Sequence, residues 1–366
     1  MKRKWAVLIA LLALPALCAP AQALTGQEAL ERQEELIQVE ELQRAAEQNG
    51  GQAQYGDSLD EGLENLLDTG TQELGGAVRT AARSGALLLV ILLFCALAES
   101  VGGLGKDGVK AASLAGTLAV TGVAVADVNS LLGLGTGAIE NMTSFANVLL
   151  PAVAAVTAAT GAVTGAAARQ LAAALFSDLL VNLIHSLLVP LLYGYIAASV
   201  AQAALGREEL KRMADLLKWT VTTVLTIITT AFVFYLTASG VVAGTADAAA
   251  VKAAKFAISG AVPVVGGILS DAAETVLASA GVLRGTVGVF GMVTILGLCL
   301  APLLRLAVHY LAYKLVAALS CALGSGPACT LVDRLSSAFG LVLGMTGACC
   351  LLLLITLVSC VSVTAA

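Results

Sequence analysis

Residues 86–105 read "ALLLVILLFCALAESVGGLG", an apolar run in which Glu99 is the one charged residue. About 20 apolar residues in a helix are enough to cross the hydrocarbon core of a bilayer. An acid inside such a span is expensive, so Glu99 either reaches the interface or bonds a neighbouring helix. The stretch therefore predicts a transmembrane helix.

The whole chain shares the apolar character of this run. Hydrophobic residues make up 58% of its 366 residues and charged residues 12%, and the mean hydropathy is +0.90. Because soluble domains carry about 25% charged residues, most of this chain cannot face water. We predict an all-α, polytopic helical membrane protein with about six spans. The other candidate spans are 110–126, 143–167, 219–243, 286–306 and 338–361.

The N-terminus has the layout of a secretory signal peptide. Basic residues at positions 2–4 precede an apolar run, and Ala21-Gln22-Ala23 supplies a cleavage site. We predict that residues 1–23 are a signal peptide, and the alternative is an uncleaved anchor helix. In either case the segment that follows is exported.

Residues 24–84 are predicted to form an acidic extracytoplasmic helical region ahead of a multi-spanning domain, residues 85–366. Thirteen acids against four arginines give this region a formal charge of −9, compared with −5 for the whole chain. Such acidity argues against nucleic acid or anionic lipid as its partner. Ser58 and Glu61 fit a capping box at the start of an amphipathic helix. That helix lies on the membrane, docks on a partner or packs as an ordinary helix.

Basic residues predict the orientation, because cytoplasmic loops carry an excess of Lys and Arg. Lys106 and Lys110 place the first short loop inside, whereas the loop expected at 127–142 has two acids and no basic residue and belongs outside. Residues 206–218 should be cytoplasmic, and so available to a soluble motor or a neighbouring subunit. The candidate contact residues are Arg207, Lys211, Arg212 and Lys218.

Two segments fit the scheme better as re-entrant hairpins than as spans. Residues 171–205 are too long for one helix and rather short for two, and a single crossing would put four basic residues outside. Residues 244–284 begin and end outside and contain "AVPVVGG" at 261–267. The candidate residues for the two turns and for a polar path are Pro190, Pro263, Gly266, Gly267, Asp271 and Glu274.

Asp271 and Glu274 have two interpretations. They start a helix, where free N–H groups favour an anion, or they line a polar path, where the charge itself matters. Backbone freed by Pro and Gly is tolerated at membrane depth only inside protein or beside water. A cap would accept Asn in place of Asp271, whereas a path would require the charge.

The sequence carries no recognisable catalytic or cofactor motif. His185 and His309 are its two histidines, which excludes H-E-x-x-H, and residues 102–108 lack the spacing and the Ser/Thr of a phosphate loop. We expect no enzyme activity, no metal and no cofactor, and an intramembrane hydrolase is the weakest function class. The seven cysteines after residue 23 lie in or near apolar segments, where they usually serve packing.

Several segments resemble a known family. They are "FANVLLPAVAAVTAATG" (145–161), "LIHSLLVPLLYGYIAASV" (183–200), "LKWTVTTVLTIITTAFV" (217–233) and "AVPVVGGILSDAAETVLASAGVLRGTVGVFG" (261–291). Their order, after a signal peptide and an acidic exported region, is similar to that of the stage III sporulation protein AE family of endospore-forming bacteria. The resemblance runs from about residue 58 to the C-terminus. Its sharpest element is P-V-V-G-G-x-x-x-D/E-A-x-E/D-x-V, which begins at Pro263 and ends at Val276.

The resemblance implies a place rather than a reaction. Members of this family are multi-spanning proteins of the mother-cell membrane that surrounds the engulfed forespore. They are encoded with an ATPase that resembles secretion motors and with ring-forming membrane proteins. With stage II sporulation protein Q across the intermembrane space, these proteins build a channel between the two cells. The family protein is required for late forespore gene expression, and the family has no established catalytic residues.

On this basis we expect a permease-like membrane core subunit of that channel. Its expected partners are the other proteins of its operon, stage II sporulation protein Q and membrane lipid, and not nucleic acid. The alternative is a self-contained secondary transporter for a small solute. Both expected hairpins contain S-x-x-V-P-x-x-x-G, at 186–194 and 259–267, and would enter from opposite faces as inverted repeats do. The two hypotheses differ in whether the protein moves a solute alone.

Overall fold

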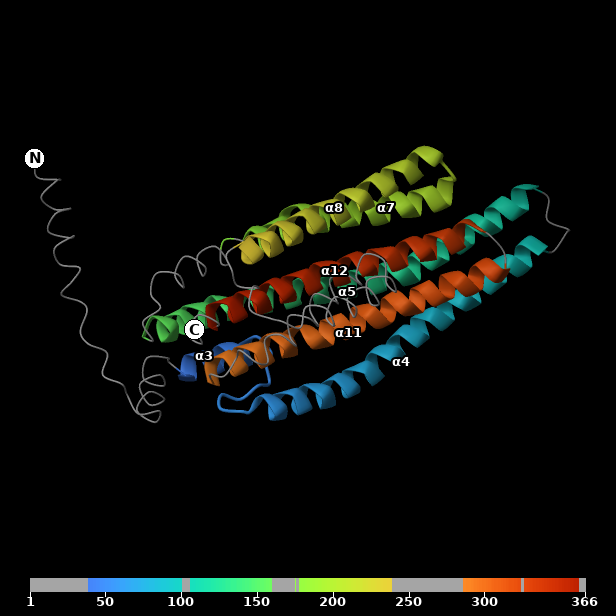
Figure 1. The fold of residues 1–366 in the computed structure, drawn as a ribbon. Coiled ribbons are helices and arrows are strands. Elements are labelled where there is room, and N and C mark those ends of the chain that lie inside the picture. Colours follow the sequence, from blue (N-terminus) through green and yellow to red (C-terminus); the bar gives the residue numbers. More distant parts are fainter. Residues whose placement is uncertain are drawn as a thin grey trace, which may run out of the picture.

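In the computed structural model, the apolar runs form long helices that lie side by side along one direction (Figure 1). Every secondary-structure element in the described ranges is a helix, and five helices are long and apolar enough to cross a bilayer. The prediction of an all-α membrane protein with about six spans is therefore confirmed in its class. The described residues are 39–100, 106–159, 175, 178–238, 286–323 and 326–361.

Two predicted segments lie outside the described residues. They are the signal peptide, residues 1–23, and the second expected hairpin, residues 244–284. The second segment includes the candidate residues Pro263, Gly266, Gly267, Asp271 and Glu274. The predictions made for them stay predictions.

Four long helices form the main bundle. They are α4 (Leu59–Ser100), α5 (Lys106–Ala159), α11 (Thr286–Leu323) and α12 (Pro327–Val361). Helix α12 packs against both α11 and α5, and α4 packs against α11 and α5. The described side chains of α12 are almost all buried, so this helix is the centre of the molecule. A short helix, α3 (Val39–Gln48), packs against α5.

Glycines let the four helices approach closely, as small residues do in membrane bundles. A Cβ placed on Gly135 of α5 would lie 2.5 Å from Cγ1 of Val342 on α12. A Cβ on Gly291 of α11 would lie 2.6 Å from Cδ2 of Leu149 on α5. Because real Cβ atoms do not come this close, larger residues at these positions would push the helices apart.

A second unit, the α7–α8 pair, lies on one side of the bundle (Figure 1). It consists of a π-helical turn, η2 (Ile184–Leu188), followed by α7 (Val189–Leu205) and α8 (Glu208–Ala238). Gly206 joins α7 to α8 with a φ of 64°, a left-handed conformation that favours glycine. The pair packs mainly against α12, and α7 also touches α5.

The hairpin predicted around Pro190 is wrong. Residues from Asp178 to Leu205 form one continuous helical segment of 28 residues, long enough for a single crossing. Proline removes an N–H and its ring crowds the preceding turn. The π-helical turn before it relieves this conflict, since the N–H of Val189 donates to the carbonyl of Ile184, five residues earlier. The helix therefore passes Pro190 without turning back.

The loop predicted at 127–142 is also wrong, whereas its placement outside stays a prediction. These residues lie within α5, one helix of 54 residues, which joins the two expected spans 110–126 and 143–167 as far as Ala159. Acidic residues are compatible with a helix interior, so an acid within an apolar run does not by itself mark a loop. Asp127 accepts a hydrogen bond from Tyr313 at 2.7 Å, and Glu140 lies 3.6 Å from His185. At 1.5 Å per residue, α5 is roughly 80 Å long.

The capping box predicted at the start of α4 is confirmed. The backbone N–H of Ser58 donates to the Glu61 carboxylate at 3.0 Å, and the N–H of Glu61 donates to Ser58 Oγ at 3.3 Å. The helix then runs for 42 residues, so the amphipathic segment and the first predicted span are a single element.

The two ends of the molecule differ in charge. The ends of α4, α7 and α11 and the starts of α5, α8 and α12 lie together (Figure 1). We name this the basic end, because Lys106, Lys110, Arg207, Lys211 and Arg212 lie there. The opposite end holds α3 and the start of α4, and we name it the acidic end. Its acids include Glu40, Glu41, Glu47, Asp57, Asp60, Glu61 and Glu64.

Candidate functional site between helix α12 and the α7–α8 pair

Polar side chains lie where the α7–α8 pair meets α12. The Tyr195 hydroxyl of α7 donates to the carbonyl of Arg334 at 2.9 Å, and Lys218 Nζ of α8 donates to Ser337 Oγ at 3.1 Å. The Arg334 guanidinium is paired with Asp215 of α8, with 3.2 Å between Nη2 and Oδ1. Charged side chains within membrane helices are rare, paired and commonly functional, so this interface is the first candidate site.

Arg334 is the least accessible charge of this interface. Its side chain is 14% exposed, and its Nη1 atom is buried without a hydrogen-bond acceptor among the described residues. Its partner Asp215 is 57% exposed. Burying a donor without an acceptor costs about 1–3 kcal/mol. A rearrangement that gave Arg334 a second acceptor would therefore be favourable, which makes this contact suited to a change of partner.

A second polar row runs along α11, where Arg305, His309 and Tyr313 recur every four residues and so share one helix face. Nε and Nη2 of Arg305 donate to Glu73 of α4 at 3.0 and 2.8 Å. The Tyr313 hydroxyl donates to Asp127 of α5. His309 is buried, and its Nδ1 lies 2.8 Å from the Arg305 carbonyl. This row joins α11 to both α4 and α5.

Further out, Lys314 of α11 pairs with Asp333 of α12 at 2.6 Å, and both side chains are about half exposed. The two rows thus reach across the bundle from α4 to α8 through charged or hydroxyl groups. Such an arrangement can set the register of the helices, and its ion pairs can exchange partners when helices move. Among the described residues, no group of three His, Cys, Asp or Glu side chains is placed to hold a metal ion.

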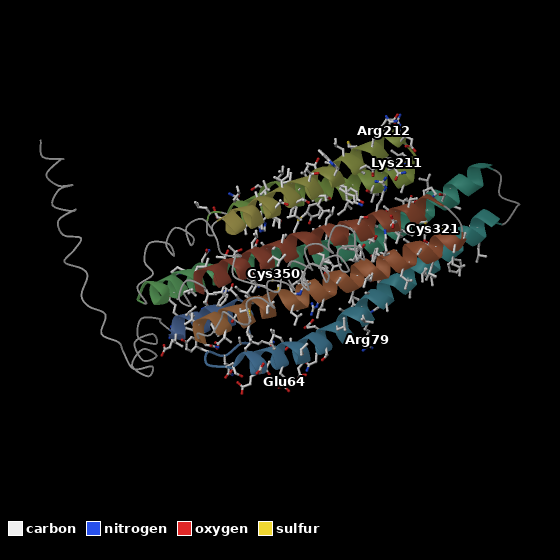
Figure 2. The ribbon with its side chains drawn as sticks, in the orientation of Figure 1. Glu64, Arg79, Lys211, Arg212, Cys321 and Cys350 are labelled. Carbon is white, nitrogen blue, oxygen red and sulfur yellow. A yellow bond between two sulfur atoms is a disulfide. The ribbon has the colours of Figure 1, made fainter. Side chains whose placement is uncertain are left out.

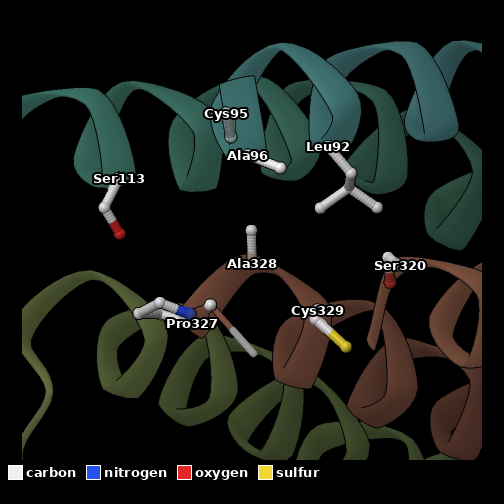
Figure 3. A pocket seen from close by; sticks show the side chains of 9 residues that line it. Leu92, Cys95, Ala96, Ser113, Ser320, Pro327, Ala328 and Cys329 are labelled. Carbon is white, nitrogen blue, oxygen red and sulfur yellow. The ribbon is translucent and has the colours of Figure 1, made fainter. Parts of the chain in front are cut away.

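A small pocket lies near the basic end, between α4, α5 and the start of α12 (Figure 3). Its lining includes Leu92, Cys95, Ser113, Ser320 and Cys329. Beside it, the sulfur atoms of Cys321 on α11 and Cys329 on α12 lie within bonding distance of each other. The lining is mostly apolar or weakly polar, and we assign no ligand to this pocket.

The structure separates the four predicted contact residues into two kinds. Arg207, Lys211 and Arg212 are exposed at the turn between α7 and α8 (Figure 2). Lys218 is half-buried and contacts Ser337 of α12 instead. Pro190 is exposed on its helix and takes no part in the polar contacts described above. The remaining predicted path residues fall outside the described ranges.

Sequence reasoning missed the residues that the bundle brings together. Asp127, Asp215, Arg305, Tyr313 and Arg334 come from four helices, and the paired residues are separated by more than a hundred positions. The available signal was a single charge inside an apolar run. Such a charge predicts a partner but does not say which helix supplies it.

These features define a class: a helical membrane protein whose long helices are knit by glycine contacts and carry paired charges inside the bundle. The model of the stage III sporulation protein AE family matches residues 51–364, and the chain therefore belongs to that family. A similar curated protein is the stage III sporulation protein AE of Bacillus subtilis (strain 168), 25% identical over 201 residues, which cover 55% of this chain and 50% of that protein. The match thus spans about half the length of this curated relative. No solved structure matches the chain.

Proposed function

We propose that this protein is a permease-like membrane core subunit of the sporulation channel that links mother cell and forespore. The observation that carries this proposal is the family match over residues 51–364 of a chain built from membrane helices. The role is needed for late forespore gene expression, and it is structural rather than catalytic. The expected partners are the ATPase and ring-forming proteins of the same operon and stage II sporulation protein Q.

The separation of charge supports an orientation for the molecule. We propose that the basic end faces the mother-cell cytoplasm and the acidic end faces away from it, as the excess of Lys and Arg at the basic end favours. A cysteine at Gln52, an exposed position next to α4, should then react with an impermeant maleimide in intact cells. Protection of Gln52→Cys until the cells are permeabilised would contradict the orientation.

The native cysteines give a second test of this orientation. Cys321 and Cys329 lie at the basic end within bonding distance of each other. Because the cytosol keeps thiols reduced, both should be thiols in cells that are quenched with an alkylating reagent before lysis. A disulfide trapped between them in such cells would place the basic end outside.

Arg207, Lys211 and Arg212 are the proposed contact for a cytoplasmic subunit, because they are exposed together at the turn of the α7–α8 pair. Changing all three to Gln should abolish co-purification of the ATPase or ring-forming proteins and reduce late forespore gene expression. The matched control is Arg79→Gln with Arg83→Gln, which neutralises exposed arginines on α4. If both sets of substitutions have equal effects while both variant proteins stay abundant in the membrane, the three residues are not the contact for a cytoplasmic subunit.

Paired charges inside the bundle favour one second candidate, a self-contained secondary transporter, because such pairs mark ion or substrate pathways in membrane proteins. Solute flux into vesicles that contain the protein alone separates the two functions. The channel-subunit proposal expects flux only when the ATPase and ring-forming proteins are present. Flux with the protein alone would favour the transporter.

Variants of Asp271 and Glu274 test whether these two acids line a polar path. If they line a path, Asp271→Asn with Glu274→Gln should stop late forespore gene expression while the protein stays abundant. If they cap a helix, Asn should serve as well as Asp, and spore yield should remain at the wild-type level.

A further inference from the structure

The exposed surface of α5 changes character along its length. Near the basic end it presents large apolar side chains, Leu114, Leu118 and Val125, and Leu118 is 62% exposed. After Val125 the exposed side chains are small or polar. The polar ones are Asn129, Ser130, Glu140, Asn141, Ser144 and Asn147. One continuous helix therefore meets an apolar environment in one part and a polar environment in another.

Helix α4 shows the same change. Its exposed residues near the basic end are Leu87, Val90, Leu93, Phe94 and Leu97, and Phe94 is 67% exposed. Toward the acidic end the exposed surface is dominated by charged and amide side chains. They are Glu64, Asn65, Asp68, Gln72, Arg79 and Arg83. The two helices run in opposite directions, so the shared change follows position in the bundle rather than position in the sequence.

The remaining outer helices extend the apolar zone around the bundle. Exposed apolar or aromatic side chains near the basic end are Leu187 on η2, Tyr193 and Leu205 on α7, Met213, Leu216, Trp219 and Ile227 on α8, and Leu311, Leu315 and Leu319 on α11. Together with those of α4 and α5 we name them the apolar belt. Each lies within about 20 residues of its helix's basic-end terminus, or roughly 30 Å along the axis. This length matches the hydrocarbon thickness of a bilayer, about 30 Å.

Of the exposed charges at the depth of the belt, Asp215 pairs with Arg334 and Lys314 with Asp333, whereas Arg83 lies 17 residues before the end of α4 and the others lie in or just before the first turns of α8. Lys314 and Asp333, about half exposed, pair with each other at 2.6 Å, which offsets part of the energy of keeping a charge near lipid. Beyond the belt, the exposed large apolar residues in the described part of the chain are Leu67, Leu74, Val78, Leu175 and Leu179. The first three lie among the charged residues of α4, so they do not continue a lipid-facing surface.

The half of the bundle toward the acidic end has an apolar core of its own. The Phe290 ring of α11 contacts Tyr55 at 5.7 Å and Phe145 of α5 at 6.1 Å, measured between ring centroids. Leu42 and Ala46 of α3 are fully buried beside α5. Apolar side chains inside and polar side chains outside are the pattern of a helical bundle in water.

We propose that lipid covers only the apolar belt, and that the other half of the bundle projects from the membrane as a water-exposed helical domain. The part of α5 after Val128 would then extend roughly 45 Å beyond the bilayer. The apolar segments near Ala159, the start of α11 and the end of α12 do not cross the membrane again but form the core of that domain. This inference concerns where lipid lies and does not depend on the orientation or on the channel role.

Nitroxide accessibility in lipid nanodiscs tests the proposal on the full chain without partners. A background in which Cys18, Cys95, Cys321, Cys329 and Cys360 are each changed to Ala leaves Cys299, Cys349 and Cys350, which are buried, as the remaining native cysteines. Spin labels at Leu118 and Phe94 should collide more with oxygen, which dissolves in lipid, than with a polar nickel complex. Labels at Asn147 and Gln72, on the same two helices, should show the reverse. Oxygen preference at Asn147 and Gln72, or protection of both from either reagent, would overturn the proposal.

Trp219 supplies a probe that leaves the bundle unchanged. It is 62% exposed in the belt, and Trp5→Phe would remove the other tryptophan of the chain. Lipids brominated in their acyl chains should quench its fluorescence strongly, and aqueous acrylamide weakly. Strong acrylamide quenching with no effect of the brominated lipids would place Trp219 in water and contradict the belt even if the spin-labelled variants did not fold.

Discussion

The four-helix bundle and the α7–α8 pair differ in how closely their helices approach. In the bundle, glycines bring backbones together, as at Gly135 with Val342 and Gly291 with Leu149, and polar links such as Tyr313 to Asp127 lie among these close contacts. The α7–α8 pair also buries apolar residues, but its contact with α12 includes the Arg334–Asp215 ion pair and the bonds of Tyr195 and Lys218. Close packing tolerates little displacement, whereas polar partners can be exchanged. The bundle is therefore the rigid unit and the α7–α8 pair is the separable one.

The largest loss of folded protein is expected from a substitution in the bundle. Gly135→Leu puts a side chain where a Cβ already lies 2.5 Å from Val342, whereas nothing lies within 4 Å of a Cβ on Gly137. Overpacking by a few methylene groups costs about 1–3 kcal/mol or more, so Gly135→Leu should lose most folded protein from the membrane. Gly137→Leu, on the same helix, should keep it. Membrane abundance and thermal unfolding in detergent measure both, and equal stability of the two variants would contradict the close contact.

A smaller effect, confined to the α7–α8 pair, is expected from Arg334→Gln. Because Asp215 is 57% exposed, water solvates it once Arg334 is lost, so we expect a cost of about 1–2 kcal/mol rather than the roughly 3–5 kcal/mol of a fully buried pair. The expected result is faster tryptic cleavage at Arg207, Lys211 or Arg212 with no loss of the bundle. Lys314→Gln, which breaks a half-exposed pair, should change little. If Arg334→Gln unfolds the whole chain, the α7–α8 pair is not a separable unit.

Tyr195→Phe tests a single hydrogen bond between α7 and α12. It removes one hydrogen bond to the Arg334 carbonyl and leaves the ring, so about 1 kcal/mol should be lost. Tyr193→Phe is the control, because Tyr193 is 46% exposed and makes no hydrogen bond among the described residues. Proteolysis of the turn should accelerate for Tyr195→Phe alone. Acceleration by both variants would show that the readout reports general loosening.

The change of smallest extent is expected at the exposed start of α4, where it affects one helical turn. Ser58→Ala removes the capping box, and loss of a cap costs about 0.5–2 kcal/mol. Amide exchange should rise in residues 59–62 and remain unchanged in α11 and α12. Faster exchange throughout the bundle would mean that the bundle depends on its exposed end.

The fold class was predictable because composition decides it, and Ser58–Glu61 was predictable because a capping box is local. Continuity of the helices was not. Hydropathy treats Asp127 and Glu140 as a break, yet Tyr313 and His185 meet these acids from other helices. Pro190 suggested a turn, but the π-helical hydrogen bond from the N–H of Val189 to the carbonyl of Ile184 accommodates the proline within a continuous helix. The polar interface around Arg334 could not be predicted either, because its partners come from helices that the sequence does not place side by side.

Helix α5 is one continuous helix that contacts both α11 and α7. Asp127 accepts a hydrogen bond from Tyr313 of α11, and roughly 20 Å further along the axis Glu140 lies 3.6 Å from His185, beyond hydrogen-bonding distance, at the π-helical turn before α7. A hydrogen-bonded helix transmits a twist along its axis better than a chain of loops does. A rotation of α5 about its axis would therefore displace its contacts with α11 and with α7 together.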